Sequence, residues 1–395
     1  MRAGFAVERM RSEGSGDPAM LATVVLLAGT GIAALWSASS GYAVSIGKGA
    51  GYFAIRQLLF LAPAALVFWA CAIVDLDRLR SKAGAITLIG LAGLLLPFIP
   101  LLGESRNGAS RWIDLGITTL QPSELWKPVM IFYLAHVLDR KRERILESPG
   151  VLIPPFLLAA TGCILVFAQN DFSTAALSII AAAFVFWAAS APLSFFLGLG
   201  AAAASLSALS ILTSDFRLRR ILAYMFPAYE PHGQGYQVLG SLRAIRSGGI
   251  LGKGMGLGTL KAGAIPEVQS DFVFAAWAEE TGLVGVLAIM AAWCFLAWRA
   301  FKVALAEEDR FRSTLGLGLT FLLVLEAFVN MGVAAGAVPA TGLALPFFSA
   351  GGSSLLSSAA ICGVLYNLSR GVARGAAESR AGYAGREAAG EVGRV

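Results

Sequence analysis

The chain has 395 residues, of which 57% are hydrophobic and 14% are charged, and its formal net charge is +6. Soluble globular domains are about 45–50% apolar and about 25% charged, so this composition excludes an ordinary soluble domain. Stretches such as 173–190 and 192–212 are almost free of charge and approach the ~20 residues that a membrane-spanning helix needs. The sequence therefore predicts an all-α, polytopic membrane protein, because hydrocarbon requires backbone polar groups to be paired within each segment.

Ten membrane spans are predicted, with a polar tail at each end of the chain. Residues 1–18 form the first tail, in which we expect no cleavage because the signal-peptide pattern is missing. Residues 369–395 form the second tail, which we expect to be disordered. The membrane domain, 19–368, contains a long loop at 213–271 between the seventh and eighth spans. The predicted spans are 19–38, 53–74, 84–102, 121–138, 151–168, 173–189, 191–212, 272–298, 313–337 and 345–368.

The distribution of Lys and Arg predicts the orientation in the membrane. If the N-terminus is cytoplasmic, the inside segments hold 19 of these residues and the short outside loops hold 3. Cytoplasmic loops carry the excess of positive charge, so we expect both termini inside and the loop 213–271 outside. The positive net charge follows mostly from this bias, and no nucleic-acid partner is predicted.

The cysteines and histidines show no metal-binding pattern. All four cysteines lie within predicted spans without a short spacing, which favours small buried hydrophobes over a disulfide or a metal site. His136 and His232 are the only histidines, so a zinc site is not expected. No cofactor is assigned. A divalent-cation requirement is left open, because acidic residues are present but no ligand spacing identifies a site.

The first interruption of the hydrophobic pattern is the polar stretch 107–132. Pro122 suits the first turn of a helix, and Glu124 follows it near the positive end of the helix dipole. Glu124 and Lys127 are at i, i+3 and share a helix face, so they are able to pair inside a span. Two interpretations remain open here, a salt bridge that holds helices together and a direct role with a charged ligand.

The second interruption is a short turn at 167–177. Asp171 is followed by Ser173 and Thr174, whose backbone N–H groups a capping carboxylate accepts from. Asp171 is therefore predicted either to cap the next helix or to line an outward-facing cavity.

The third interruption is the loop 213–271, which is too long for a passive connection. Its first part reads as an amphipathic helix whose arginines are able to meet anionic membrane lipids. Its glycine-rich part, 247–258, carries Lys253, and its small residues allow backbone N–H groups to approach a phosphate-like ligand. A flexible re-entrant turn explains the same pattern. The spacing is not that of a Walker A loop.

Three acids follow within the stretch 268–282. Asp271 lies at the start of the eighth predicted span, whereas Glu279 and Glu280 lie inside it. Glu279 is about 12 Å deeper than Asp271 at 1.5 Å per residue, and the two glutamates point about 100° apart. Asp271 is therefore predicted at the outer rim, while Glu279 and Glu280 are expected to pair with cations or to line a cavity. Loop cations and a rim carboxylate suit a lipid that carries a pyrophosphate and a sugar.

Six stretches of this chain, in this order, carry a family resemblance. They are NGASRWIDLG (107–116), QPSELWK (121–127), QNDFSTA (169–175), GYQVLGSLRAIRSGGILGKGMG (235–256), IPEVQSDFVFAAWAEETG (265–282) and PATGLALPFFSAGGSSLL (339–356). From about residue 20 to 370 the chain resembles the SEDS family (shape, elongation, division and sporulation) of peptidoglycan polymerases. The ten helices and the large outer loop of that family agree with the spans predicted independently.

The resemblance implies a glycosyltransferase that polymerises lipid II into glycan strands at the outer face of the bacterial cytoplasmic membrane. Asp271 matches the proposed catalytic acid of the family and is predicted as the general base, with undecaprenyl pyrophosphate leaving and the sugar configuration inverted. Matching positions and loop cations supply the candidate substrate-binding residues Arg111, Trp112, Gln121, Lys127, Arg243 and Lys253. Glu124, Asp171, Glu279 and Glu280 are assigned supporting or cavity-lining roles. Small residues of the last motif are assigned to close helix packing, namely Ser349, Gly351, Gly352 and Ser353.

The pattern at 235–249 favours the division branch of the family, at the septum, over an elongation or sporulation branch. The resemblance also implies a class B penicillin-binding protein as transpeptidase partner, together with other division proteins, the growing glycan strand and membrane lipids. Two alternatives from other classes are a lipid II flippase and a scaffold that only recruits a partner.

Overall fold

The computed structural model describes residues 16–106, 109–116, 118–198, 200–201, 205, 224–225, 234–259 and 268–392, and the fold is described for these residues. The long helices are α2 (Pro18–Ser45), α3 (Tyr52–Ile73), α6 (Pro122–Arg140), α8 (Ile153–Ala168), α9 (Phe172–Ala188), α13 (Val273–Ala306), α14 (Arg310–Ala334) and α15 (Gly352–Val392). Shorter elements are α4 (Leu76–Ser81), α5 (Ala83–Leu95), α7 (Arg142–Glu147), α12 (Gln234–Gly248) and the 3-10 turns η1 (Leu96–Phe98) and η2 (Pro149–Leu152).

Nine of the ten predicted spans correspond to helices within the described ranges, namely α2, α3, α5, α6, α8, α9, α13, α14 and α15. Six helices of this described part are long and apolar enough to cross a membrane, and α5 and α9 are shorter apolar helices. The seventh predicted span, 191–212, lies largely outside the described residues. The predicted helical membrane fold is confirmed.

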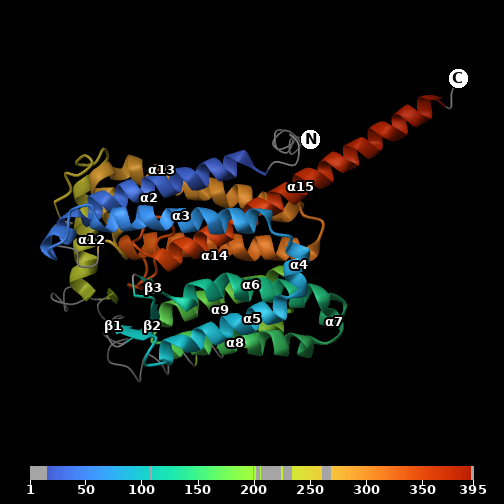
Figure 1. Cartoon of the computed structure of the whole chain (residues 1–395), viewed down its shortest axis with the longest axis horizontal. Coiled ribbons are helices and arrows are strands. Elements are labelled where there is room, and N and C mark those ends of the chain that lie inside the picture. Colours follow the sequence, from blue (N-terminus) through green and yellow to red (C-terminus); the bar gives the residue numbers. More distant parts are fainter. Residues whose placement is uncertain are drawn as a thin grey trace.

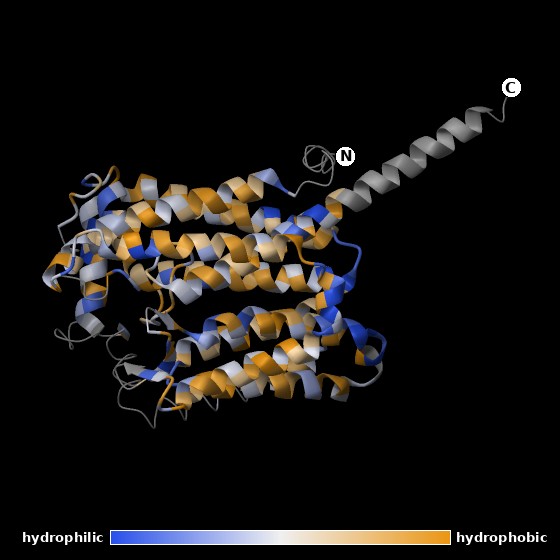
Figure 2. Cartoon of the chain, in the orientation of Figure 1, coloured by the Kyte–Doolittle hydropathy of each residue, from blue (hydrophilic) through white to orange (hydrophobic). Residues whose placement is uncertain are grey.

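The long helices lie side by side in two groups (Figure 1). One group contains α2, α3, α13, α14 and α15, and the other contains α5, α6, α8 and α9. α14 joins them, because it packs against α13 and α15 in its own group and against α6 and α9 in the other. Hydrophobic residues run along the helices, and hydrophilic residues gather around α4 and α7 (Figure 2). Exposed apolar side chains such as Leu66, at 73%, belong to the surface that a bilayer covers.

The prediction of an all-α protein is incomplete, because the structure also contains a small antiparallel sheet. Its strands are β1 (Gly103–Arg106), β2 (Ala109–Asp114) and β3 (Thr119–Leu120), in the order β1-β2-β3. Ile113 lies opposite Leu120, which ties the sheet to the residues directly before α6. The segment is too short and too polar to continue as a span, and pairing satisfies its backbone groups instead. β2 thereby presents Arg111 and Trp112 near the start of α6.

Helix α13 is broken where the glycine-rich loop meets it. Gly282 has φ 64° and ψ −163°, a conformation that is essentially restricted to glycine. Gly252 of the loop packs directly against Gly282. A Cβ added to Gly282 would lie 2.3 Å from the backbone nitrogen of Gly252. The loop is held by backbone hydrogen bonds, among them Lys253 N to Glu279 O (3.0 Å) and Gly254 N to Glu280 O (2.9 Å). The predicted re-entrant turn is therefore an ordered turn that docks into the break of α13.

Replacing Gly282 with alanine is expected to lower the free energy of unfolding by at least about 2 kcal/mol, because it adds both backbone strain and a steric clash. Chemical unfolding of the purified protein in detergent measures this change. Gly93→Ala is the matched control, because Gly93 is helical and an added Cβ there would meet no neighbour within 4 Å. The control is expected to be neutral or slightly stabilising. Equal stability of the two variants would contradict the prediction.

Two element boundaries and one burial prediction differ from the sequence-based expectations. α13 continues to Ala306, beyond the predicted end at residue 298. α15 continues as a helix to Val392, so there is no helix boundary at residue 368. Cys294 is exposed rather than buried, because it lies on an outward-facing side of α13. The continuation of α13 is consistent with the absence of proline there, whereas α15 continues through Arg370 and Gly371, a pair that is typical of a helix end.

The connection between α13 and α14 contains a carboxylate with an unusual environment. Glu307 follows the last residue of α13, and its buried Oε1 has no hydrogen-bond partner within the described part of the chain. Burial raises the pKa of Glu307 to about 7, and the nearby Arg312 guanidinium opposes this rise. The protonated form is therefore favoured in the folded protein below about pH 7.

Stability of the folded protein is expected to fall as the pH rises from about 4.5, the ordinary pKa of Glu307, to about 7. In this window the folded state holds a proton that the unfolded state releases, so raising the pH favours unfolding. Thermal unfolding of wild type and Glu307→Gln at several pH values between 4.5 and 7.5 measures the effect. The variant is expected to lose this part of the pH dependence, and identical pH profiles would contradict the assignment.

Candidate functional site

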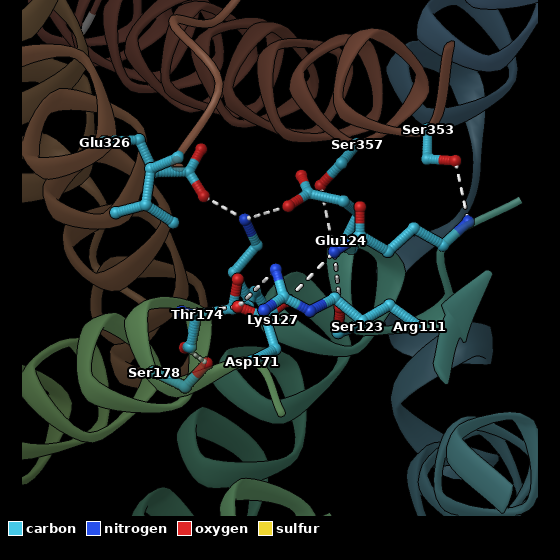
Figure 3. Close-up of polar contacts among 12 residues, drawn as sticks. Arg111, Ser123, Glu124, Lys127, Asp171, Thr174, Ser178, Glu326, Ser353 and Ser357 are labelled. Carbon is cyan, nitrogen blue, oxygen red and sulfur yellow. Dashed lines mark hydrogen bonds and ion pairs between the residues drawn. The ribbon is translucent and has the colours of Figure 1, made fainter. Parts of the chain in front are cut away.

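A buried ionic triad lies at the junction of the two helix groups (Figure 3). Lys127 Nζ lies 2.9 Å from Glu124 Oε1 and also forms an ion pair with Glu326 of α14. The Lys127 side chain is only 1% exposed. A buried cation is tolerated in a membrane protein only when it is paired, and here two carboxylates share it. Ser357 of α15 donates to the carbonyl of Glu124 (2.8 Å), so three helices meet at this triad.

The predicted pairing of Glu124 and Lys127 is present, whereas the sequence analysis missed Glu326. The signal was available, because Glu326 is an acid in the middle of the apolar run 313–337. Its partner was not available, because Glu326 and Lys127 are separated by 199 residues. The triad supports the interpretation of a salt bridge that holds helices together.

A second group of contacts, around Asp171, lies next to the triad in Figure 3. Asp171 Oδ1 accepts a hydrogen bond from Thr174 N (3.3 Å), so Asp171 caps α9. Capping was one of the two predicted roles of this residue. The same carboxylate faces Arg111 Nη1 at 3.7 Å and accepts from Gln121 Nε2 at 3.0 Å. Arg111 also donates to the carbonyl of Asn170. Asp171 is therefore both a helix cap and an anchor for Arg111 and Gln121, which come from other elements.

Arg111 is more accessible than Lys127. Its side chain is 23% exposed, its guanidinium lies 5.9 Å from the centre of the Trp112 ring, and its Nε is buried without a hydrogen-bond partner among the described residues. Arg111 therefore has an uncommitted donor beside an aromatic ring, whereas Lys127 is enclosed by protein.

The predicted base, Asp271, is half-buried and lies two residues before α13. A Cβ added to Gly342 would lie 3.8 Å from Asp271 Oδ2, so the carboxylate faces the loop between α14 and α15. Asn330 of α14 donates to the carbonyl of Asp271 (3.2 Å). Asn330 and Glu326 are at i, i+4 and share one face of α14. One helix face therefore contacts both the Asp271 segment and the ionic triad.

The two glutamates of the same stretch have separate partners. Lys253 Nζ lies 2.7 Å from Glu279 Oε1, which also accepts from Thr259 N at 3.0 Å. Ser37 of α2 donates to Glu280 Oε1 at 2.7 Å. The expected pairing of Glu279 with a cation is present. Lys253, predicted as a substrate contact, pairs with Glu279 and is 32% exposed. The predicted contact Arg243 is exposed on α12.

The small residues of the last motif have two kinds of contact. A Cβ on Gly352 would lie 2.7 Å from the Phe60 ring, so this glycine allows close packing as predicted. Ser353 and Ser349 act as hydrogen-bonding residues: Ser353 Oγ accepts from Gln121 N (2.8 Å), and Ser349 donates to the carbonyl of Ser270. Gly351 is half-buried, and a Cβ added there would lie 3.6 Å from Ser354 Cβ, an ordinary contact distance. No group of three potential metal ligands was found among the described residues.

Comparison with known proteins identifies the family. The family model described as "Cell cycle protein", which covers FtsW, RodA and SpoVE, matches residues 18–373. The chain belongs to the FtsW/RodA/SpoVE family. The resemblance drawn from the six motifs is thus confirmed, and the match includes the triad, the Asp171 group and Asp271.

Individual members of the FtsW/RodA/SpoVE family match over most of the chain. A probable peptidoglycan glycosyltransferase FtsW of Trichlorobacter lovleyi is 36% identical over 90% of this chain and 93% of its own length. Stage V sporulation protein E of Bacillus subtilis is 32% identical over 90% of this chain and 97% of its own.

Solved structures show the same fold. A chain of a peptidoglycan synthase complex, in which polymerization and crosslinking are coordinated, has a TM-score of 0.73 at 27% identity and covers 90% of this chain and 98% of its own length. The rod shape determining protein RodA of Thermus thermophilus has a TM-score of 0.66 at 26% identity, with coverages of 90% and 97%.

Proposed function

We propose that this protein is a peptidoglycan glycosyltransferase that polymerises lipid II into glycan strands. Relatives named probable peptidoglycan glycosyltransferase FtsW align with about 90% of the chain, which supports this assignment. The observation that carries it is the half-buried acid Asp271, held against α14 on the face that also contacts the buried triad.

Asp271 acts as the general base in this proposal. Its carboxylate accepts the proton from the 4-hydroxyl of the acceptor sugar as that oxygen attacks the anomeric carbon of the growing chain. The bond between that carbon and the pyrophosphate oxygen breaks, and undecaprenyl pyrophosphate leaves with its electron pair. Attack opposite the leaving group inverts the configuration.

Arg111 is the cation proposed to contact the pyrophosphate. Its side chain is partly exposed, and a charge-assisted hydrogen bond to a phosphate oxygen suits a guanidinium. The Trp112 ring lies beside the Arg111 guanidinium, which also faces Asp171, and Asp171 accepts from Gln121. Lys127 is enclosed by Glu124 and Glu326, so we propose that it supports the site without contacting the substrate.

We propose the division branch and a cytoplasmic-membrane location with both termini inside and Asp271 at the outer face. The excess of Lys and Arg in the inside segments supports the orientation. The FtsW relatives support a role in septal synthesis. The similarity to the sporulation protein supports the alternative, a role in elongation or sporulation. A transpeptidase partner, proposed to be a class B penicillin-binding protein, is supported by the similar chain from a peptidoglycan synthase complex.

The test is the product formed by the purified full-length protein with its partner and labelled lipid II. The expected product is a ladder of glycan strands on a gel, together with released undecaprenyl pyrophosphate. Reconstitution in vesicles with lipid II on one side measures transport in parallel. Movement of lipid II across the vesicle membrane without strand formation would replace the polymerase by a flippase. Neither activity, with division still supported in cells, would indicate a scaffold.

A further inference from the structure

Three consecutive backbone carbonyls at Asp271 each accept a hydrogen bond from a different donor. Ala350 N donates to Gln269 O (2.8 Å) and Ser349 Oγ donates to Ser270 O. Asn330 Nδ2 donates to Asp271 O (3.2 Å). The donors belong to α14 and to the residues that lead into α15, far from Asp271 in the sequence. We call this arrangement, carbonyls 269–271 with Asn330, Ser349 and Ala350, the carbonyl clamp.

The two side-chain donors of the carbonyl clamp are themselves fixed. Asn330 is 2% exposed, and its Nδ2 also donates to Leu343 O at 2.7 Å. Ser349 is 3% exposed, and its Oγ accepts from Leu345 N at 2.8 Å. Gln57 of α3 donates to the carbonyl of Ser349 (3.2 Å). Buried donors with two partners each leave little freedom to the backbone that they hold.

The segment that holds the backbone also borders the Asp271 carboxylate. Gly342, which is exposed and has φ +75°, lies beside Asp271 Oδ2. Leu343, the next residue, is fixed by Asn330. Movement of Asn330 would therefore shift both the carbonyl of Asp271 and the residues that flank its side chain.

We propose that Asn330 and Ser349 are positioning residues, which hold the backbone of Asp271 so that its carboxylate meets the acceptor hydroxyl. This inference rests on the proposed role of Asp271 as general base. Proton transfer requires the base within hydrogen-bond reach of the proton, and a displacement of about 1 Å lowers rates by up to about 100-fold. Ser349, interpreted from the sequence as a packing residue, thus has a role in the reaction.

The experiment compares Asn330→Ala, Ser349→Ala and the conservative Ser349→Thr with two matched controls. Asn367→Ala removes an asparagine that donates to two carbonyls, Cys71 O (2.9 Å) and Val74 O (2.7 Å). Ser369→Ala removes a buried serine that accepts from Asp17 N (2.9 Å) and donates to Tyr366 O (2.7 Å). Both controls lose the same kinds of hydrogen bond as the clamp variants. The two control residues lie about 15 residues from the start of α15 and hence at the other end of the bundle.

Polymerisation of labelled lipid II by the full-length protein with its partner is measured across pH. Asn330→Ala and Ser349→Ala are expected to lower kcat by about 10–100-fold with KM within about twofold, and to shift the acidic limb of the pH profile. Ser349→Thr keeps the hydroxyl and is expected to restore most of kcat. Both controls are expected to retain wild-type kcat. Wild-type kcat in the clamp variants, or an equal loss in the controls, would overturn the proposal.

A second measurement separates this proposal from the assignment of the reaction. Two measurements report on the carbonyl clamp and do not require strand formation. They are hydrogen–deuterium exchange over residues 268–276 and the rate of carbodiimide modification of Asp271. Both are expected to increase in Asn330→Ala and Ser349→Ala and to stay unchanged in the controls. If wild type forms no strands, the proposed function fails while these rates still decide the clamp. Unchanged exchange and modification rates in the clamp variants would overturn the proposal of the carbonyl clamp.

Discussion

Replacing Asp271 with asparagine is expected to lower the rate of strand formation by about 10²–10⁴-fold, the usual contribution of a general base. Asparagine keeps the size and the hydrogen-bonding capacity of the side chain, but it is unable to accept the proton of the acceptor hydroxyl. Binding of lipid II does not require that proton transfer, so KM is expected to change little. Initial rates with labelled lipid II, measured at several substrate concentrations, separate the two parameters.

Asp75→Asn is the matched control for this experiment. Asp75 is an exposed carboxylate that caps α4 through Asp77 N and Arg78 N, far from the site. Asparagine is an equally good capping residue, so the control is expected to polymerise and to unfold like wild type. Wild-type strand formation by Asp271→Asn would remove Asp271 from the reaction. Retained transport of lipid II by an Asp271→Asn protein that forms no strands would instead support the flippase alternative.

Replacing Lys127 with methionine is expected to lower the free energy of unfolding by about 3–5 kcal/mol, as found when one partner of a buried ion pair is removed. Methionine fills a similar volume, so the effect comes from leaving Glu124 and Glu326 without their cation. The two carboxylates would face each other in a region from which water is excluded. Chemical unfolding in detergent measures the change, and strand formation is expected to fall with the folded fraction.

A neutral triad provides the control for Lys127→Met. The triple variant Glu124→Gln, Lys127→Met, Glu326→Gln removes all three charges and keeps the side-chain sizes. It is expected to recover most of the stability, because replacing a complete buried ion network with neutral groups is often close to neutral. A triple variant as unstable as Lys127→Met would show that packing, rather than charge pairing, determines the role of the triad.

Much of the architecture was predictable because the bilayer constrains the sequence directly. An apolar run of ~20 residues has few alternatives to a membrane helix, so the positions of nine helices could be read from composition. Local geometry was equally accessible. Glu124 and Lys127 share a helix face through their spacing of three residues, and Asp171 caps α9 through Thr174, three residues later.

Other elements escaped prediction because their signals were local exceptions. The sheet at 103–120 has strands of only two to six residues, too short for a reliable alternating pattern. The break of α13 at Gly282 depends on the loop that docks there, and a glycine within an apolar run is common in membrane helices. Asn330 stood in an apolar run as a polar residue, which marked it as unusual without indicating its partner.

The sequence by itself determined the membrane class, the helices, the family motifs and Asp271 as the candidate base, because these depend on composition and on neighbours along the chain. Tertiary structure alone decided which polar groups far apart in the sequence meet. Lys127 pairs with Glu326 across 199 residues, Lys253 binds Glu279, and Asn330 and Ser349 hold the backbone around Asp271. Each of these contacts follows from helices that pack side by side, where a buried polar group must be satisfied by whichever partner the packing brings within reach.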